Sequence, residues 1–180
     1  MDLDYPFLAD SGRRLILVTA HRRESFGAPF ESLCHALLQL AENHPEVELV
    51  YPVHLNPNVR EPVGKILDGH PRIHLIEPLR YEQFVHMMKR AYFILTDSGG
   101  VQEEAPFLGI PCLVMRDNTE RPEAVAAGTA RLVGTDTSRI VASAELLLQD
   151  EGIYSAMARG GSPFGDGLAS ERIASILAAS

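Results

Sequence analysis

Cysteine is scarce in this chain, and long apolar runs are missing altogether. Only two of the 180 residues are cysteine, too few for a disulfide framework. Cys34 falls in a helical pattern and Cys112 in a strand, so both are expected to be small buried hydrophobic residues. No apolar run is long enough to cross a bilayer, and no charged segment followed by an apolar stretch resembles a secretory leader. These absences predict a protein of the reducing cytoplasm without a membrane partner.

An excess of basic residues is also missing. Aspartate and glutamate total 24 against 16 lysines and arginines, which gives a formal net charge of −8. Binding to DNA or RNA needs a basic face for the phosphates, so no nucleic-acid partner is expected. Local clusters of basic residues remain suited to a small anionic ligand, and they include Arg22, Arg23, Arg116 and Arg121.

The common metal and nucleotide fingerprints are absent as well. The chain has neither H-E-x-x-H nor C-x-x-C spacing, and therefore no metal site is expected. It contains neither the G-x-G-x-x-G dinucleotide fingerprint nor the G-x-x-x-x-G-K-[ST] phosphate loop. No cofactor is expected, and any case for a nucleotide must come from other residues.

What the chain does contain is a regular alternation of short apolar segments with segments of helical period. Strands are predicted over residues 15–19, 47–53, 73–76, 92–96, 111–115 and 130–133. Helices are predicted over residues 29–43, 58–67, 81–91, 100–108, 121–127, 138–148, 154–159 and 168–178. With 46% hydrophobic residues, the chain has enough apolar side chains for one ordinary core.

This alternation predicts an α/β fold. Strands that are apolar along their whole length are typical of a parallel sheet covered by helices on both faces. We therefore expect a Rossmann-like parallel sheet of about six strands, in which ligands bind at the carboxyl ends of the strands. Residues 1–13 are expected to be an N-terminal tail or linker, and residues 14–180 a single domain.

The most informative segment is 93–104, where an apolar strand runs into Ser-Gly-Gly (98–100) and then a helix. Glycines permit a sharp turn and leave the first helical N–H groups uncovered, which favours an anion. One of Glu103 and Glu104 is expected to accept hydrogen bonds from sugar hydroxyls, and the other to complement the helix dipole. A plain N-cap at Ser98 is the simpler alternative, but a cap does not need two glycines. The segment suggests a seat for a nucleotide diphosphate and its ribose.

The letters Asp-Ser-Gly-Gly (97–100) also imitate the nucleophile loop of chymotrypsin-like serine proteases. Those enzymes are disulfide-bonded β-barrels with a distant His and Asp, whereas this chain has a parallel α/β pattern and two lone cysteines. A catalytic triad is recognised by geometry and roles rather than by four letters, so a protease is rejected.

Polar residues follow other strands at the same predicted edge of the sheet. His21 and Arg22 come directly after the first strand, where either can meet phosphate, and a histidine can donate to an anion near neutral pH. His54 closes the second strand in a loop stiffened by prolines, which suits a fixed ligand contact as well as a structural role. Arg121 begins a helix, where a cation opposes the helix dipole unless it faces an anion.

Four motifs together resemble the bacterial non-hydrolysing UDP-N-acetylglucosamine 2-epimerase family. They are HRRESFG (21–27), YPVHLNPNVREPV (51–63), LTDSGGVQEEAPFLGIPCLVMRDNTERPEAV (95–125), and GDG followed by A and RI (165–173). The resemblance runs from about residue 14 to the C-terminus and covers only the second half of such an enzyme. It implies the C-terminal half of a glycosyltransferase B-like architecture, in which two Rossmann-like domains enclose the active site.

The resemblance implies roles for individual residues. Contacts to the UDP-sugar are implied for His21, Ser98, Gly99, Gly100, Glu104 and Arg121, with Phe84 against the uracil and Leu79 contributing through its backbone. His21 is the one catalytic candidate in this chain. In bacterial relatives a second UDP-N-acetylglucosamine acts as an allosteric activator, and Arg22 and His54 match residues on that side of the cleft.

The implied reaction is the interconversion of UDP-N-acetylglucosamine and UDP-N-acetylmannosamine by elimination and re-addition of UDP, for cell-surface polysaccharide synthesis. The acidic residues that move protons in the family lie in the N-terminal domain, so this chain alone is expected to be inactive. Implied partners are UDP-N-acetylglucosamine or UDP, the N-terminal epimerase domain and, in the full-length enzyme, a second copy in a homodimer. Two alternatives remain open, the donor-nucleotide domain of a B-type glycosyltransferase and a non-catalytic UDP-binding module.

Overall fold

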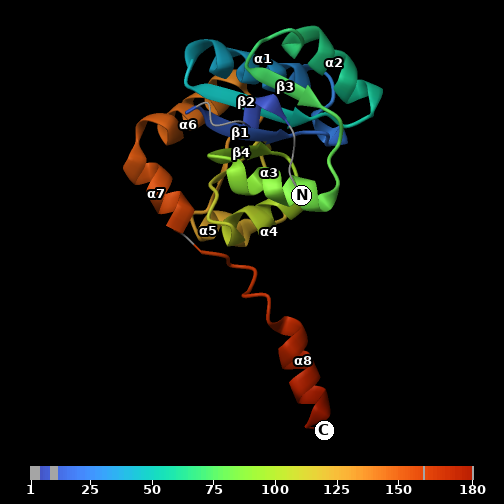
Figure 1. Ribbon diagram of the computed structural model, residues 1–180, viewed down its shortest axis with the longest axis vertical. Coiled ribbons are helices and arrows are strands. Elements are labelled where there is room, and N and C mark those ends of the chain that lie inside the picture. Colours follow the sequence, from blue (N-terminus) through green and yellow to red (C-terminus); the bar gives the residue numbers. More distant parts are fainter. Residues whose placement is uncertain (1–4, 9–11, 160, 180) are drawn as a thin grey trace.

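Six parallel strands form one sheet in the described part of the chain (Figure 1). The structure is a computed structural model that describes residues 5–8, 12–159 and 161–179. The strands are β1 (Arg14–Thr19), β2 (Val47–Pro52), β3 (Ile73–Ile76), β4 (Phe93–Thr96), β5 (Cys112–Val114) and β6 (Ala130–Leu132). Their order across the sheet is β3-β2-β1-β4-β5-β6, and each neighbouring pair is parallel.

Helices cover both faces of this sheet, which confirms the predicted α/β fold (Figure 1). They are α1 (Ala28–Asn43), α2 (Pro57–Leu67), α3 (Tyr81–Arg90), α4 (Gly99–Phe107), α5 (Pro122–Ala126), α6 (Thr137–Gln149), α7 (Glu151–Arg159) and α8 (Ala169–Ala178), with short 3-10 turns at Pro6–Leu8 and Arg23–Ser25. Side chains alternate along β1, since Ile16 and Val18 pack with α1, α2 and α6 while Leu17 packs with α3 and α4. This alternation gives the sheet a core on each face.

The start of α7 differs from prediction. It begins at Glu151, three residues before the predicted 154–159 segment. The Asp150 side chain accepts the N–H of Ile153 at 2.9 Å and so caps the first turn. Gly152 lies in that turn, and because glycine is unfavourable inside a helix the sequence pattern placed the start too late.

Part of the tail expected over 1–13 packs on the domain. Leu8 is buried against the face of the sheet that α3 and α4 cover. Arg90, at the end of α3, donates a hydrogen bond to the Leu8 carbonyl. Residues 1–4 and 9–11 of the tail lie outside the described residues.

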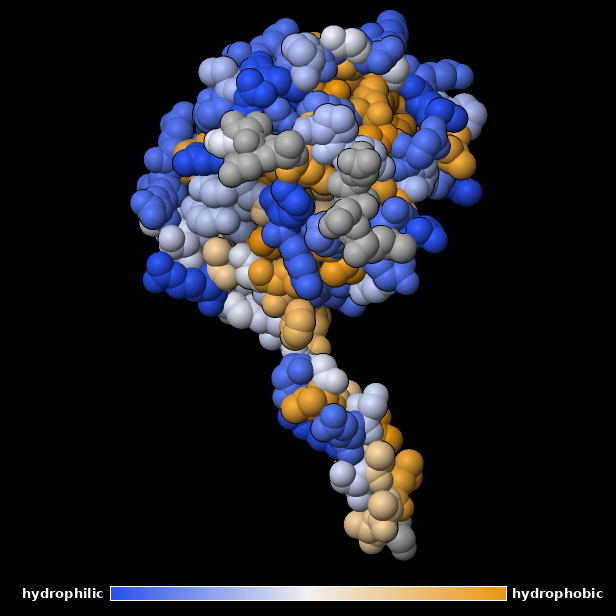
Figure 2. Space-filling view, viewed as in Figure 1, coloured by the Kyte–Doolittle hydropathy of each residue, from blue (hydrophilic) through white to orange (hydrophobic). Residues whose placement is uncertain are grey.

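The C-terminal helix α8 projects away from the body (Figure 1). Its apolar side chains Ile173, Ile176 and Leu177 are exposed, and Figure 2 shows hydrophobic residues along one side of this projection. Within the described ranges, no helix has both the length and the apolar character that crossing a bilayer requires.

Candidate functional site

The carboxyl ends of β1 and β4 meet at the centre of the sheet. The strand order reverses there, because β2 and β3 continue on one side of β1 and β5 and β6 on the other side of β4. Such a switch point is where open α/β sheets bind ligands. Thr19 and Thr96 end the two strands as a ladder pair and share a hydrogen bond of 2.6 Å between their Oγ1 atoms. The loops that follow them carry several of the predicted ligand contacts.

Asp97 anchors the loop that follows β1. Its side chain is buried, and Oδ2 accepts the backbone N–H groups of His21 and Arg22, each at 2.7 Å. Tyr51 supplies a second anchor, because its hydroxyl donates to the carbonyl of Ala20 at 2.5 Å. Asp97 was not predicted as a site residue. The sequence feature that could have identified Asp97 is its position directly after a fully buried strand, at the edge of the sheet where ligands bind.

The Ser-Gly-Gly turn places the N-terminus of α4 at this edge. Ser98 occupies the N-cap position, but its side chain makes no capping hydrogen bond. The first four N–H groups of a helix have no partner within the helix. A Cβ atom built on Gly99 would lie 3.6 Å from Nη2 of Arg22 and 3.9 Å from Nη2 of Arg121. A helix N-terminus and two guanidinium groups therefore create a local positive field in a chain of net charge −8.

Neighbouring carboxylates orient these two arginines. Arg121 donates through Nε to the Glu103 carboxylate and through Nη1 to the Glu120 carbonyl, the latter at 3.0 Å. Nη1 of Arg22 lies 3.5 Å from Oε1 of Glu120. The Nη2 atoms of both arginines face Gly99 instead. Each guanidinium is thus held by acidic partners while one of its nitrogens points toward the helix N-terminus.

Arg116, which the sequence suggested as a further ligand cation, has a structural role. It is buried, donates to Glu24 at 2.6 Å and binds both oxygens of Glu120 at 2.6 and 3.0 Å. These hydrogen bonds from Arg116 are the main reason that the pKa of Glu120 is lowered from 4.5 to about 2. Arg116 therefore fixes the loop that carries Arg121 rather than offering donors to a ligand.

Five predicted residues line one cavity of about 230 Å³ beside the Ser-Gly-Gly turn, and they are His21, His54, Leu79, Phe84 and Ser98. The rings of His21 and His54 stack with their centroids 5.2 Å apart. Leu79 and Phe84 provide the apolar part of the lining. A small polar and apolar cavity of this kind suits a planar base joined to a charged group.

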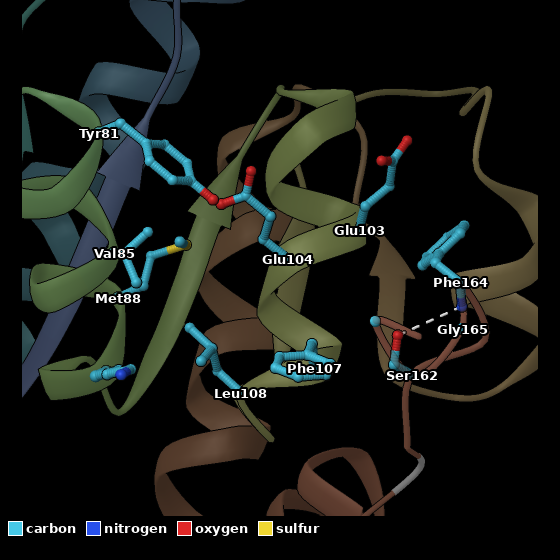
Figure 3. A pocket seen from close by; sticks show the side chains of 12 residues that line it. Tyr81, Val85, Met88, Glu103, Glu104, Phe107, Leu108, Ser162, Phe164 and Gly165 are labelled. Carbon is cyan, nitrogen blue, oxygen red and sulfur yellow. Dashed lines mark hydrogen bonds between the residues drawn. The ribbon is translucent and has the colours of Figure 1, made fainter. Parts of the chain in front are cut away.

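Glu104 lines a different cavity, of about 390 Å³, between α3 and α4 (Figure 3). Figure 3 shows the Tyr81 side chain and the Glu104 carboxylate pointing toward each other across this space, with Phe107 and Phe164 farther along. Burial raises the pKa of Glu104, and the nearby Glu103 carboxylate raises it further. Tyr81 was not predicted as a site residue, because the sequence pattern indicated only that a helix begins there.

The two cavities are adjacent, because neighbouring residues of α3 and α4 line them. Phe84 of α3 and Val101 of α4 line the smaller cavity, while Val85 and Glu104 line the larger one. Glu104 comes five residues after Gly99, which corresponds to about 7.5 Å along a helix axis. The predicted contact residues that line cavities are therefore divided between two adjacent cavities along α4. Among the described residues, no group of three or more His, Cys, Asp or Glu side chains is arranged to hold a metal ion.

Known proteins are similar to this chain in sequence over most of its length. The sequence profile of the family described as UDP-N-acetylglucosamine 2-epimerase matches residues 2–178. A probable UDP-N-acetylglucosamine 2-epimerase of Ralstonia nicotianae is 64% identical over 161 residues, and the UDP-N-acetylglucosamine 2-epimerase of Escherichia coli K12 is 59% identical over 170 residues. These alignments cover 89% and 94% of this chain but 43% and 45% of the relatives. The chain thus spans less than half the length of the curated relatives it matches.

Solved structures share the fold. The UDP-GlcNAc 2-epimerase from Neisseria meningitidis, solved bound to UDP-GlcNAc, is 46% identical with a TM-score of 0.92, over 98% of this chain and 47% of that one. A heptosyltransferase of Escherichia coli with ADP is only 13% identical, with a TM-score of 0.56 over 81% of this chain and 46% of its own, and is similar in fold alone. The predicted glycosyltransferase B-like fold is confirmed.

Proposed function

Because the chain belongs to the UDP-N-acetylglucosamine 2-epimerase family, we propose that it is the UDP-binding, C-terminal half of such an enzyme. The observation that carries the proposal is the N-terminus of α4, flanked by Arg22 and Arg121 at the centre of the sheet. The diphosphate accepts hydrogen bonds from the amides of Gly99 and Gly100 and from the two guanidinium groups. Ser98 and His21 contact it from the adjoining cavity.

The uridine extends from the diphosphate along α4. Glu104, about 7.5 Å along the helix from Gly99, accepts hydrogen bonds from the ribose hydroxyls. Phe84 lies against the uracil, and Leu79 contributes through its backbone. The lining of the two cavities supports this placement, because an acidic group and an apolar wall lie on the same side of the helix.

The proposed reaction interconverts UDP-N-acetylglucosamine and UDP-N-acetylmannosamine. A proton leaves C2 of the sugar and the C1–O bond to UDP breaks, which gives 2-acetamidoglucal and UDP. A proton then returns to the opposite face of C2 while UDP adds back to C1. The diphosphate gains negative charge as the C1–O bond breaks, and the helix N-terminus with its two arginines stabilises that charge.

We assign the proton transfer to the N-terminal half of the enzyme. A base must lie within hydrogen-bond reach of the C2 proton. Three carboxylates around the α4 N-terminus already have structural roles in this chain, since Oδ2 of Asp97 holds the loop after β1, Glu103 pairs with Arg121, and Glu120 pairs with Arg116. The isolated chain is therefore proposed to bind UDP without turning the sugar over.

The same proposal includes three further partners, which are the N-terminal domain, a second copy of the enzyme and an activating second ligand. The N-terminal epimerase domain closes over the α4 N-terminus, and the full-length enzyme is a homodimer in the cytoplasm. A second UDP-N-acetylglucosamine acts as activator through Arg22 and His54. Because Arg22 lies beside Gly99 and His54 stacks on His21, that second ligand would lie directly against the substrate.

The role of Glu104 gives a direct test of the proposal. Replacing Glu104 with alanine is expected to weaken UDP binding about tenfold, because one set of charge-assisted hydrogen bonds is lost. 2′,3′-Dideoxyuridine diphosphate lacks the ribose hydroxyls that Glu104 is proposed to bind. The wild-type chain is therefore expected to bind UDP about tenfold more tightly than this analogue, and Glu104→Ala is expected to bind the two equally. Affinities are measured by NMR titration, with Glu42→Ala, an exposed change near the end of α1, as the control.

Acid should weaken the same interaction. The pKa of Glu104 is raised above 4.5, so the carboxylate takes up its proton, and loses its charge, at a higher pH than an ordinary glutamate. UDP affinity of the wild type is therefore expected to fall as the pH drops through that raised pKa, whereas Glu104→Gln removes this step. Equal UDP affinity for wild type and Glu104→Ala, with no preference for the ribose hydroxyls, would exclude the ribose contact.

A further inference from the structure

One buried oxygen beneath the site has no hydrogen-bond partner. Oδ1 of Asp97 is inaccessible to solvent and accepts no hydrogen bond in the described structure, although Oδ2 of the same carboxylate accepts two. Buried carboxylate oxygens are nearly always hydrogen-bonded, because leaving one unsatisfied is energetically costly. The orientation of this carboxylate therefore calls for a donor that lies close by.

The His21 imidazole is placed to be that donor. Its Nδ1 atom lies 3.8 Å from Oδ1 of Asp97. A shift of less than about 1 Å would bring the two atoms into hydrogen-bond range. His54 stacks on one face of the His21 ring and limits how that ring can turn. With Nδ1 directed at Asp97, Nε2 is the ring nitrogen left to face the cavity that His21 lines.

We propose that Asp97 is a positioning residue for His21. Through Oδ2 it fixes the backbone of the loop, and through Oδ1 it holds the proton of the neutral imidazole on Nδ1. Nε2 then faces the ligand as an acceptor, and when the ring is protonated Nε2–H donates to the diphosphate while Asp97 balances the charge. This last role rests on the proposed function, whereas the choice of tautomer depends on the chain alone.

A single substitution separates the two roles of Asp97, which are to anchor the loop backbone and to set the His21 tautomer. In Asp97→Asn the amide oxygen can still accept the N–H groups of His21 and Arg22, so the loop keeps its anchor. The amide nitrogen then replaces Oδ1 and is a donor, which disfavours a proton on Nδ1 of His21. We expect neutral His21 to change from the Nδ1–H to the Nε2–H tautomer.

The tautomer is measured by long-range ¹H–¹⁵N correlation of the histidine rings at about pH 8.5, well above the ordinary imidazole pKa. Asp150→Asn is the matched control, because Asp150 is also a carboxylate that accepts a backbone N–H, at the start of α7. His54, the other titratable group facing His21, is followed in the same spectra. An Nε2–H proton on His21 in the wild-type chain would overturn the proposal even if Asp97→Asn failed to fold.

UDP titrations distinguish this inference from the proposed function. At about pH 5.5, below the ordinary imidazole pKa, Asp97→Asn is expected to weaken UDP binding about tenfold in the wild-type background, because the protonated His21 ring loses the carboxylate that balances its charge. The loss should be much smaller when His21 is already alanine, because Asp97 acts through His21. An equal loss in both backgrounds would show a purely structural role and overturn the positioning role. If the wild-type chain binds no UDP but has the Nδ1–H tautomer, the proposed function fails while Asp97 still positions His21.

Discussion

Replacing Arg22 and Arg121 together with alanine is expected to abolish measurable UDP binding. Three or four charge-assisted hydrogen bonds of about 1.5–3 kcal/mol each, less an association cost of at least about 4 kcal/mol, place the wild-type dissociation constant near the millimolar range. Each arginine removed should cost about ten- to a hundredfold in affinity. Loss of Arg121 also leaves the Glu103 carboxylate unpaired beside the diphosphate, and this repulsion adds to the effect.

The measurement is a UDP titration of each single variant and the double variant. The control is Arg60→Ala with Arg139→Ala, which removes the same charge from two exposed arginines that pair with Glu77 and Asp117 at 3.5 and 3.8 Å. Raised salt should weaken wild-type binding, because exposed charges are screened. A double variant that binds UDP like the control would show that the diphosphate lies elsewhere.

Incubating UDP-N-acetylglucosamine with the purified chain is expected to give no UDP-N-acetylmannosamine. The groups that remove and return the C2 proton are assigned to polypeptide that this chain does not contain. Loss of general acid–base catalysis alone costs a factor of about 10²–10⁴, so the rate should be at least about 10²-fold below that of a full-length relative. Proton NMR follows both the epimer and any exchange of the C2 proton with D₂O.

Adding the N-terminal half of a full-length relative should restore some turnover. A chain mutated at Arg121 serves as the control, since it should not support that rescue. Epimerisation or C2 exchange by the isolated chain would contradict the assignment, and His21 and Glu104 would then be the first candidates for the base. Transfer of the sugar to an added acceptor would instead favour a glycosyltransferase.

Much of the fold could be predicted because the central strands β1, β4 and β5 are buried along nearly their whole length and therefore form apolar runs in the sequence. Helix ends were marked by glycines that adopt positive φ, at Gly109 (φ 70°) and Gly128 (φ 75°). The start of α7 was missed because a side-chain cap at Asp150 outweighs the unfavourable glycine that follows it. The packing of Leu8 was missed as well, because its contact with α3 joins residues far apart in the sequence.

The site was predictable where it depends on topology alone. The carboxyl ends of neighbouring parallel strands must share one edge of the sheet, which brings His21, His54 and Ser98 to one cavity. The pairing of charges was not predictable in this way. Arg116 pairs with Glu24 across 92 positions of sequence, and Asp97 binds a loop 75 and 76 residues before it. Such contacts depend on side-chain geometry that no local pattern encodes.

UDP binding at the α4 N-terminus is tested by an amide NMR titration of the ¹⁵N-labelled chain with UDP. We expect saturable shifts that are largest at Gly99 and Gly100, with smaller shifts at Arg22 and Glu104 and little change in α1 or α6. Shifts confined to other parts of the chain, or unchanged glycine amides at saturating UDP, would contradict it.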